Sequence, residues 1–279
     1  MLTKQNTGIS KKIHCFVINL ERDNERRKVM HQQLVKHDIN FDFIDAVDGR
    51  TLSEKELKTL SSRLKMLTIT KAAMTRGEIG CALSHIKTYQ TIVEKSIEYA
   101  LILEDDTLIN KDTKNILQLL SNQFSSEEET IVCLNPVKWY KKNNLIKLTE
   151  NYRIADLYDP NTMGAMGYFI TLAAAKKLHK NLLPVFTPAD HWFYFNLHFI
   201  KVKVLIPHCV DYSPLTLISS IDSIENRHAL HNSENEQKSA PFSLKTIFMR
   251  KQYQFIKSCY KSFRNILAIQ QIKYPVNRS

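Results

Sequence analysis

The chain has 279 residues, of which 43% are hydrophobic, and this content supports a folded core and disfavours a disordered or fibrous protein. The net charge is +11, but residues 238–279 hold nine Lys or Arg and no Asp or Glu, which leaves +2 for residues 1–237. The basic charge therefore belongs to a C-terminal tail, and the composition argues against nucleic-acid binding by the whole fold.

Nothing in the sequence predicts export or a membrane span. Residues 1–14 are polar and lack the apolar run of a secretory signal, and no later segment approaches the roughly 20 apolar residues of a transmembrane helix. The cysteines are scattered and form no Cys-x-x-Cys pair, which predicts reduced, mostly buried side chains and no zinc site. We therefore expect a cytoplasmic protein.

Strands and helices are expected to alternate along most of the chain. Residues 13–20 are a compact apolar run, and a polar turn and a helix separate them from a second strand at 41–46, which ends at an Asp-Gly turn. The other expected elements are helices at 53–60, 77–93, 112–120 and 172–180, strands at 100–103, 130–134, 168–171 and 202–206, and an irregular excursion at 138–160. This pattern predicts an α/β fold with a mixed, mostly parallel sheet flanked by helices.

Three adjacent carboxylates, Glu104, Asp105 and Asp106, follow the buried strand at 100–103. Open α/β sheets bind ligands at the carboxyl ends of their strands. Mg²⁺ and Mn²⁺ prefer carboxylate oxygens together with substrate phosphates. Because the first and third side chains of a strand point the same way, Glu104 and Asp106 are expected to share one face. Taken alone, the triplet is equally consistent with a turn or a helix cap.

Several motifs accompany the triplet in a fixed order. They are INLER at 18–22, GEIGCALSH at 77–85, LILEDD at 101–106, GAMGY at 164–168, PAD at 188–190 and SSI at 219–221. Together they resemble glycosyltransferase family 25, the lipooligosaccharide-biosynthesis galactosyltransferases of Gram-negative bacteria. The resemblance covers roughly residues 13–221. It implies a GT-A-type (Rossmann-type) fold, a UDP-sugar donor, a divalent metal of the Mn²⁺ or Mg²⁺ type, and inversion at the anomeric carbon.

The resemblance also implies roles for individual residues. It places Asp106 and Glu104 at the metal and the ribose, although this chain has Glu where the family pattern has Asp. His208 is a candidate third metal ligand, because some GT-A enzymes use a late histidine; a structural role is the alternative.

A UDP-sugar carries two negative phosphates, which a metal and arginine side chains can neutralise. Arg22, Arg26, Arg27 and Lys87 are therefore candidates for phosphate contacts, with a solvated helix face as the alternative. The residues that we expect at the donor are Asn19, Leu20, Arg22, Arg26, Asp45, Ala46, Glu78, Ser84, Lys87, Glu104, Asp105 and Gly164.

Asp190 is expected to be the general base, because an inverting transfer needs a group that takes the proton of the acceptor hydroxyl. It opens a predicted helix, and the rings of Trp192, Phe193 and Tyr194 are expected to face sugars. The alternative is a helix N-cap beside aromatic residues of the core.

Residues 238–279 predict a basic amphipathic helix, separate from a catalytic domain at 1–237. Such a helix suits the anionic inner leaflet of a bacterial membrane. The alternative is that it packs on the domain and dimerises or solubilises it. We expect a peripheral inner-membrane enzyme that moves galactose from UDP-galactose to lipooligosaccharide in a β linkage. UDP-glucose as the donor is one alternative, and a non-enzymatic basic module that binds membrane or nucleic acid is a more distant one.

Overall fold

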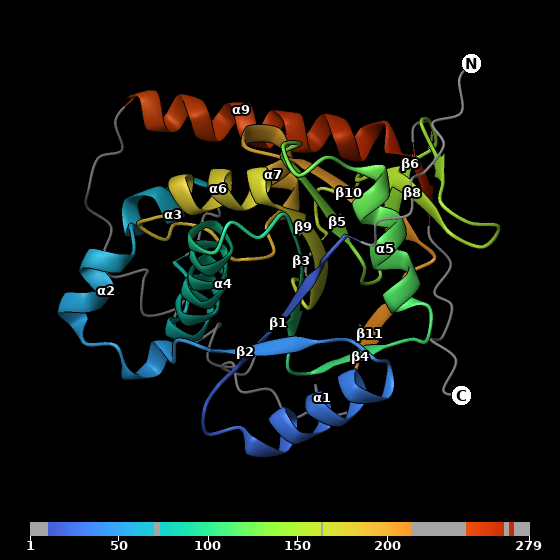
Figure 1. Ribbon diagram of the computed structural model, residues 1–279. Helices are drawn as coiled ribbons and strands as arrows, with labels where there is room; N and C mark the ends of the chain where they lie inside the picture. Colours follow the sequence, from blue (N-terminus) through green and yellow to red (C-terminus); the bar gives the residue numbers. More distant parts are fainter. Residues whose placement is uncertain (1–10, 70–72, 163, 214–243, 265–267, 271–279) are drawn as a thin grey trace.

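The computed structural model describes residues 11–69, 73–162, 164–213, 244–264 and 268–270, and a central sheet with helices on both faces organises it (Figure 1). The eight strands of this sheet follow the order β2-β1-β3-β9-β5-β10-β8-β7. Their bounds are β1 His14–Asn19, β2 Phe41–Asp45, β3 Tyr99–Glu104, β5 Thr130–Cys133, β7 Ile146–Lys147, β8 Arg153–Asp156, β9 Gly167–Thr171 and β10 Lys201–Ile206.

Six of these eight strands run in the same direction. β1 is parallel to β2 and β3, and β10 is parallel to β5. β9 lies antiparallel between β3 and β5, and β8 lies antiparallel between β10 and β7. The predicted α/β class with a mixed, mostly parallel sheet is therefore confirmed.

The expectation of an irregular excursion at 138–160 is wrong in part. Its strands β7 and β8 extend the main sheet, and β6 (Trp139–Lys141) pairs with β12 (Ala268–Gln270) in a small separate sheet. β4 (Thr107–Ile109) and β11 (Val210–Tyr212) form a further two-stranded sheet directly after the acidic triplet. These strands have two to four residues, too few to show a two-residue alternation in the sequence.

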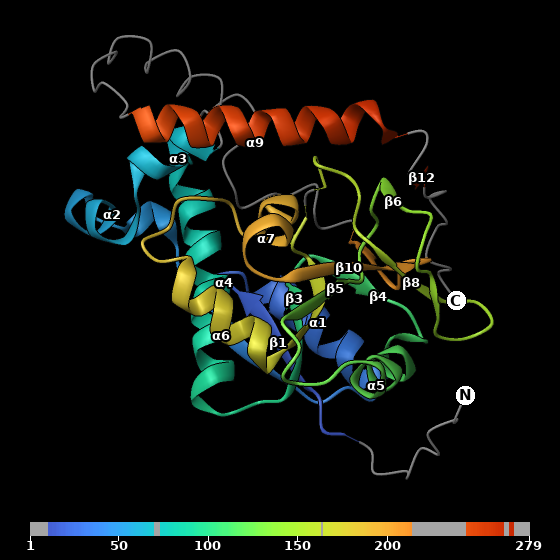
Figure 2. The same cartoon turned by 90° about the horizontal axis from the view of Figure 1, so that it is seen from above.

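Helices cover both faces of the sheet (Figures 1 and 2). α4, α6 and α7 contribute to one apolar cluster with one face of the strands, and α1 and α5 contribute to a second cluster on the other face. The helix bounds are α1 Asn24–Lys36, α2 Glu54–Leu60, α3 Arg63–Ile69, α4 Arg76–Glu94, α5 Thr113–Gln123, α6 Leu172–Asn181, α7 Trp192–His198 and α9 Leu244–Ser262. Among the described residues, no helix is both long enough and apolar enough to cross a bilayer.

Two glycines bring the turn after β2 against α4. A Cβ at Gly80 would lie 2.5 Å from the carbonyl oxygen of Val47, and a Cβ at Gly49 would lie 1.7 Å from that of Arg76. Ser84 then fixes the turn, because its Oγ accepts the Val47 N–H at 2.8 Å. Only residues without a side chain allow this approach.

α9 packs on the rest of the molecule through one of its sides. It runs next to α3 (Figures 1 and 2). Tyr253 is only 7% exposed, its hydroxyl lies 2.8 Å from His191 Nε2, and Tyr158 donates a hydrogen bond to the carbonyl of Tyr260. The predicted helix is therefore present over Leu244–Ser262, and its inner side packs on the domain, as the alternative expected. A helical tail over all of 238–279 is wrong, because Ala268–Gln270 form strand β12. The motif at 219–221 lies outside the described residues.

His191 makes the stability of this packing depend on pH. Burial, then the positive charges of Lys257 and His198, lower the pKa of His191 from 6.5 to about 4. Its ring nitrogens contact the hydroxyls of Thr187 and Tyr253. In the unfolded chain, His191 binds a proton as the pH falls below about 6.5, whereas in the folded chain it stays neutral until the pH approaches 4. The contribution of His191 to stability is therefore fully present above pH 6.5 and is lost as the pH falls toward 4.

We predict that His191→Gln flattens this pH dependence. The parent protein should lose up to about 3 kcal/mol of unfolding free energy through His191 between pH 7 and pH 4, because one pKa unit corresponds to about 1.4 kcal/mol. Glutamine keeps hydrogen-bonding groups but takes up no proton in this range. Urea unfolding at several pH values measures the difference, and parallel pH profiles for the two proteins would contradict the prediction.

Candidate active site

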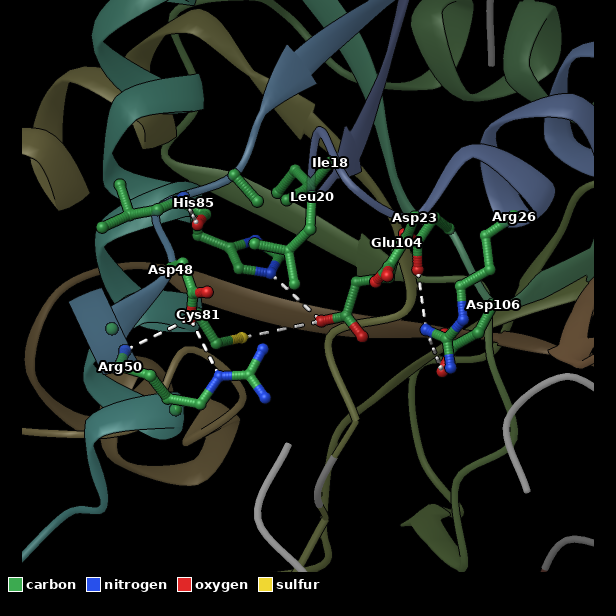
Figure 3. A pocket seen from close by; sticks show the side chains of 16 residues that line it. Ile18, Leu20, Asp23, Arg26, Asp48, Arg50, Cys81, His85, Glu104 and Asp106 are labelled. Atoms are coloured by element: carbon green, nitrogen blue, oxygen red, sulfur yellow. Dashed lines mark hydrogen bonds and ion pairs between the residues drawn. The ribbon is translucent and has the colours of Figure 1, made fainter. Parts of the chain in front are cut away.

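An open pocket lies at the carboxyl ends of β1, β2 and β3, beside the first half of α4 (Figure 3). Strand ends, the turn after β2 and one face of α4 supply its walls. Its described lining consists of Ile18, Leu20, Asp23, Arg26, residues 46–50, Gly77, Cys81, Ser84, His85 and residues 104–106. This is the edge at which open α/β sheets bind ligands.

The three carboxylates of the triplet have different partners. Asp105 is buried, and it accepts hydrogen bonds from Asn19 Nδ2 at 2.7 Å and Arg26 Nη1 at 2.9 Å. The same Arg26 nitrogen lies 3.7 Å from Asp106 Oδ2. Asp105 thus fixes Arg26 and the end of β1, whereas Asp106 and Glu104 border the pocket.

The pocket concentrates negative charge. Burial, followed by the charge of Glu104, raises the pKa of Asp106 to about 7, although Arg26 opposes the shift. Burial is also the largest cause that raises the pKa of Asp105, which Asn19 and Arg26 lower. The single positive charge of Arg26 therefore does not neutralise the negative charge of the triplet. A divalent cation at Glu104 and Asp106 would neutralise more of it. Carboxylate oxygens open to a pocket fit Mg²⁺ or Mn²⁺.

Glu104 also has partners on α4. Its Oε1 lies 3.2 Å from His85 Nε2 and 3.9 Å from Cys81 Sγ. Figure 3 shows Glu104 with Cys81 and His85 on one side and with Arg26 and Asp106 on the other. His85 Nδ1 lies 2.7 Å from the hydroxyl of Tyr168. Glu104 thus stands between two groups of functional side chains.

The structure brings only part of the predicted donor set to the pocket. The predicted residues that line it are Leu20, Arg26, Ala46, Ser84, Glu104, Asp105 and Asp106. Asn19 is not part of the described lining, but it donates a hydrogen bond to Asp105, which is. The described lining leaves out Arg22, Asp45, Glu78, Lys87, Gly164, Asp190 and His208.

Other contacts hold several of these outlying residues. Arg22 pairs with Asp48 at the rim of the pocket. Lys87 donates to the backbone carbonyl of Asp45 at 2.8 Å, and the Asp45 carboxylate is exposed. Glu78 caps α4, because its side chain accepts the N–H of Thr75 at 2.8 Å. These contacts belong to the scaffold around the pocket.

His208 lies in the buried segment between β10 and β11. Burial is the main cause that lowers the pKa of His208, and its Nε2 lies 3.7 Å from Asp211 Oδ2. Within the described part of the chain, the group of side chains whose spacing suits a metal contains His85 rather than His208.

Asp190 holds the loop at Gly164. Its Oδ2 accepts the N–H of Gly164 at 2.7 Å, and Trp192 donates to the carbonyl of the same glycine. Burial raises the pKa of Asp190, and the charge of Glu104 adds to the shift, so the two carboxylates interact. The N-cap of α7 is His191, which means that the alternative of a simple N-cap at Asp190 is wrong.

The expectation that the rings of α7 face sugars is wrong for Trp192 and Phe193. They are 0% and 2% exposed, because they pack into the core and under α9. Tyr212, which was not predicted near the site, is 52% exposed. Its hydroxyl lies 3.5 Å from the position that a Cβ on Gly164 would occupy. Tyr212 thus borders the loop that Asp190 holds.

Part of the pocket wall was not predicted. It consists of Asp48, Gly49 and Arg50 in the turn after β2 and of Cys81 on α4, whereas His85, which also extends from α4, belongs to the predicted motif at 77–85. The usable signal was the spacing within residues 77–85: positions 77, 81, 84 and 85 fall on one face of a helix.

Comparison with known proteins places this α/β fold among the glycosyltransferases. The family model described as glycosyltransferase family 25 (LPS biosynthesis protein) matches residues 12–193, and the chain belongs to this family. A "Procollagen galactosyltransferase 2" of Homo sapiens is 29% identical over 170 residues, which are 58% of this chain and 26% of that protein.

Two further relatives are similar over comparable lengths. A "Putative glycosyltransferase" of Haemophilus influenzae is 30% identical over 170 residues, 59% of this chain and 56% of that protein. A "Glycosyltransferase 25 family member" of Aedes aegypti is 30% identical over 204 residues, 70% of this chain and 32% of that protein. The match thus spans about half of the bacterial relative and a third or less of the animal ones.

Proposed function

We propose that this glycosyltransferase moves galactose from UDP-galactose onto a lipooligosaccharide or lipopolysaccharide acceptor, with inversion and a β linkage. The observation that carries the proposal is the pocket in which Glu104 and Asp106 stand beside Arg26 at the carboxyl ends of β1 to β3. Relatives named procollagen galactosyltransferase support galactose, and the family description supports the acceptor class.

The residues divide the work between the leaving group and the acceptor. Asp106 and Glu104 would hold Mn²⁺ or Mg²⁺, which would supply positive charge for the diphosphate of UDP. Arg26, fixed by Asp105, adds a permanent cation next to it. Leu20 and Ala46, at the ends of β1 and β2, flank the uracil and ribose.

Asp190 is the general base of this proposal. It takes the proton of the acceptor hydroxyl while that oxygen forms a bond to the anomeric carbon, and the bond between that carbon and UDP breaks on the opposite face. Burial raises the pKa of Asp190, which makes its carboxylate a better proton acceptor. The hydrogen bond from Gly164 fixes one carboxylate oxygen.

A donor screen tests the proposal. The full chain is incubated with UDP-galactose, UDP-glucose and UDP-N-acetylglucosamine, each with Mn²⁺ or with a chelator, and with or without truncated lipooligosaccharide. We expect metal-dependent release of UDP from UDP-galactose that the acceptor accelerates. Faster turnover of UDP-glucose would replace galactose by glucose in the proposal, and the absence of release from every donor would overturn it.

We also propose that the outer side of α9 lies on the anionic cytoplasmic face of the inner membrane. Phe248 and Phe255 are 67% and 70% exposed on this helix, and Phe263, directly after it, is 53% exposed. Lys251 and Lys261 are exposed beside them. Aromatic side chains that enter the interface, with lysines that pair with anionic headgroups, suit such a surface.

Replacement of Phe248 and Phe255 by aspartate is predicted to abolish binding to vesicles that contain phosphatidylglycerol. The change removes the apolar area that would enter the lipid interface, and it places two negative charges next to anionic lipid. At such a surface each nearby Lys or Arg contributes about 1 kcal/mol to binding. Co-sedimentation measures binding. Val35→Asp, which alters an exposed apolar residue of α1, is the control and should leave binding intact. Equal binding of the parent protein to neutral vesicles would contradict the proposal.

A further inference from the structure

Cys81, His85 and Glu104 converge on one wall of the pocket, apart from Asp106 (Figure 3). Their ligand atoms all lie within 4.8 Å of one another. Cys81 and His85 are four residues apart and therefore share one face of α4, while Glu104 ends the neighbouring strand β3. The spacing of the cysteines could not predict this group, because only one of its three members is a cysteine. The other two are His85 and Glu104, and Glu104 belongs to a different element of the fold.

The distances suit a tetrahedral cation. Zinc bonds of about 2.3 Å to sulfur and about 2.0 Å to nitrogen or oxygen put neighbouring ligand atoms roughly 3.3 to 3.6 Å apart. The observed separations from Glu104 Oε1 are 3.2 Å to His85 Nε2 and 3.9 Å to Cys81 Sγ. The third pair, Cys81 Sγ and His85 Nε2, lies within 4.8 Å. A bound cation would therefore draw the sulfur toward the other two ligand atoms.

Tyr168 sets the orientation of the histidine. Its hydroxyl lies 2.7 Å from His85 Nδ1 and 2.9 Å from the hydroxyl of Tyr89, and all three side chains are buried. When Nδ1 donates its proton to the Tyr168 oxygen, Nε2 presents a lone pair toward Cys81 and Glu104. A metal-binding histidine is commonly fixed in this way, through a hydrogen bond from its other ring nitrogen.

We propose that Cys81, His85 and Glu104 bind a thiophilic divalent cation, with Zn²⁺ as the physiological choice. Sulfur, imidazole and carboxylate form a ligand set typical of zinc, whereas Mg²⁺ prefers oxygen ligands. On binding, the thiol releases its proton to solvent as the sulfur–metal bond forms. The three protein ligands leave a fourth position, which opens to the pocket.

This site shares Glu104 with the carboxylate site at Asp106. A cation bound at Cys81 draws Glu104 toward α4 and away from the donor side, so Zn²⁺ is expected to inhibit the transfer supported by Mn²⁺. This inhibition rests on the proposed function. The binding of the cation does not.

Cobalt titration of the metal-free full chain tests the binding. Co²⁺ bound to a thiolate gives a near-ultraviolet charge-transfer band, and we expect this band in the parent protein and its loss when Zn²⁺ displaces Co²⁺. Cys81→Ser should lose the band and weaken Co²⁺ binding at least about tenfold. Removal of a residue that only supports a metal ligand already weakens binding by about this factor. Cys259→Ser, on α9 and outside the described lining of the pocket, should keep both.

The cobalt titration contains no sugar donor, so a negative result would count against the metal site and not against the proposed transferase activity. Absence of the band in the parent protein, or its persistence in Cys81→Ser, would overturn the inference. Thermal unfolding by circular dichroism checks that Cys81→Ser folds. If it does not fold, Glu104→Gln takes its place: the band should persist with at least about tenfold weaker binding, and unchanged affinity would overturn the inference.

Discussion

Replacing Asp106 by alanine is expected to abolish the Mn²⁺-dependent part of UDP binding and to reduce the release of UDP from the donor by about 10²- to 10³-fold. Loss of one preorganised charge-stabilising group has an effect of this size. Arg26 is bonded to Asp105 at 2.9 Å, so we expect the wall of the pocket to be preserved in the variant. Isothermal titration with UDP, with and without Mn²⁺, measures the binding.

The same variant has a second expected property, which separates loss of function from loss of fold. Burial raises the pKa of Asp106 to about 7 from 3.8 in the unfolded chain. The folded chain therefore holds a proton that the unfolded chain releases between these values, and above pH 7 the ionised carboxylate costs folding free energy. In metal-free buffer at pH 8, Asp106→Ala should unfold at a temperature no lower than the parent protein.

Asp42→Ala is the control for this experiment, because Asp42 is an exposed carboxylate on β2 and the described pocket lining does not include it. It should bind UDP with the same dependence on Mn²⁺ as the parent protein. Metal-dependent UDP binding that survives in Asp106→Ala would move the cation to other ligands, and the group of Cys81, His85 and Glu104 would be the first to examine.

Asp190→Asn is expected to keep donor binding and to lose transfer by about 10²- to 10⁴-fold, the usual contribution of a general base. Asparagine has nearly the same shape, and its carbonyl oxygen can still accept the N–H of Gly164, so the loop should stay in place. What it lacks is the ability to take a proton. UDP titration should match the parent protein, while product formation with the acceptor should fall.

Asp159→Asn is a matched control for Asp190→Asn. Asp159 is a buried carboxylate that, like Asp190, accepts a backbone hydrogen bond, in its case from the N–H of Asn161 at 2.9 Å, and it precedes the same loop. Its variant should keep transfer. A normal transfer rate in Asp190→Asn would show that another group takes the proton.

The alternation of strands and helices could be predicted because the apolar run at 13–20 and the helical spacing at 77–93 are strong local patterns. The direction of β9 could not. A run of buried residues looks the same in a parallel and an antiparallel strand, and β9 lies between β3 and β5, which come earlier in the chain.

The candidate site likewise contains residues that the sequence could predict and residues that it could not. Leu20, Arg26 and Asp106 could be predicted at the pocket because they follow strands whose carboxyl ends share one edge of the sheet. Asp48 reaches the pocket through the contact that Gly49 and Gly80 allow between the turn after β2 and α4, and no local pattern encodes that contact. For Trp192 and Phe193, the sequence could not separate rings that bind sugars from rings of the core.

The hydrogen bond between Tyr253 and His191 links α9 to the residue that follows Asp190. A change in the position of α9 would therefore reach the proposed base through two side chains. If lipid shifts the helix, the turnover number on a bilayer would differ from that in solution even when substrate is saturating. Measuring only the enrichment of the enzyme near its acceptor would miss this difference.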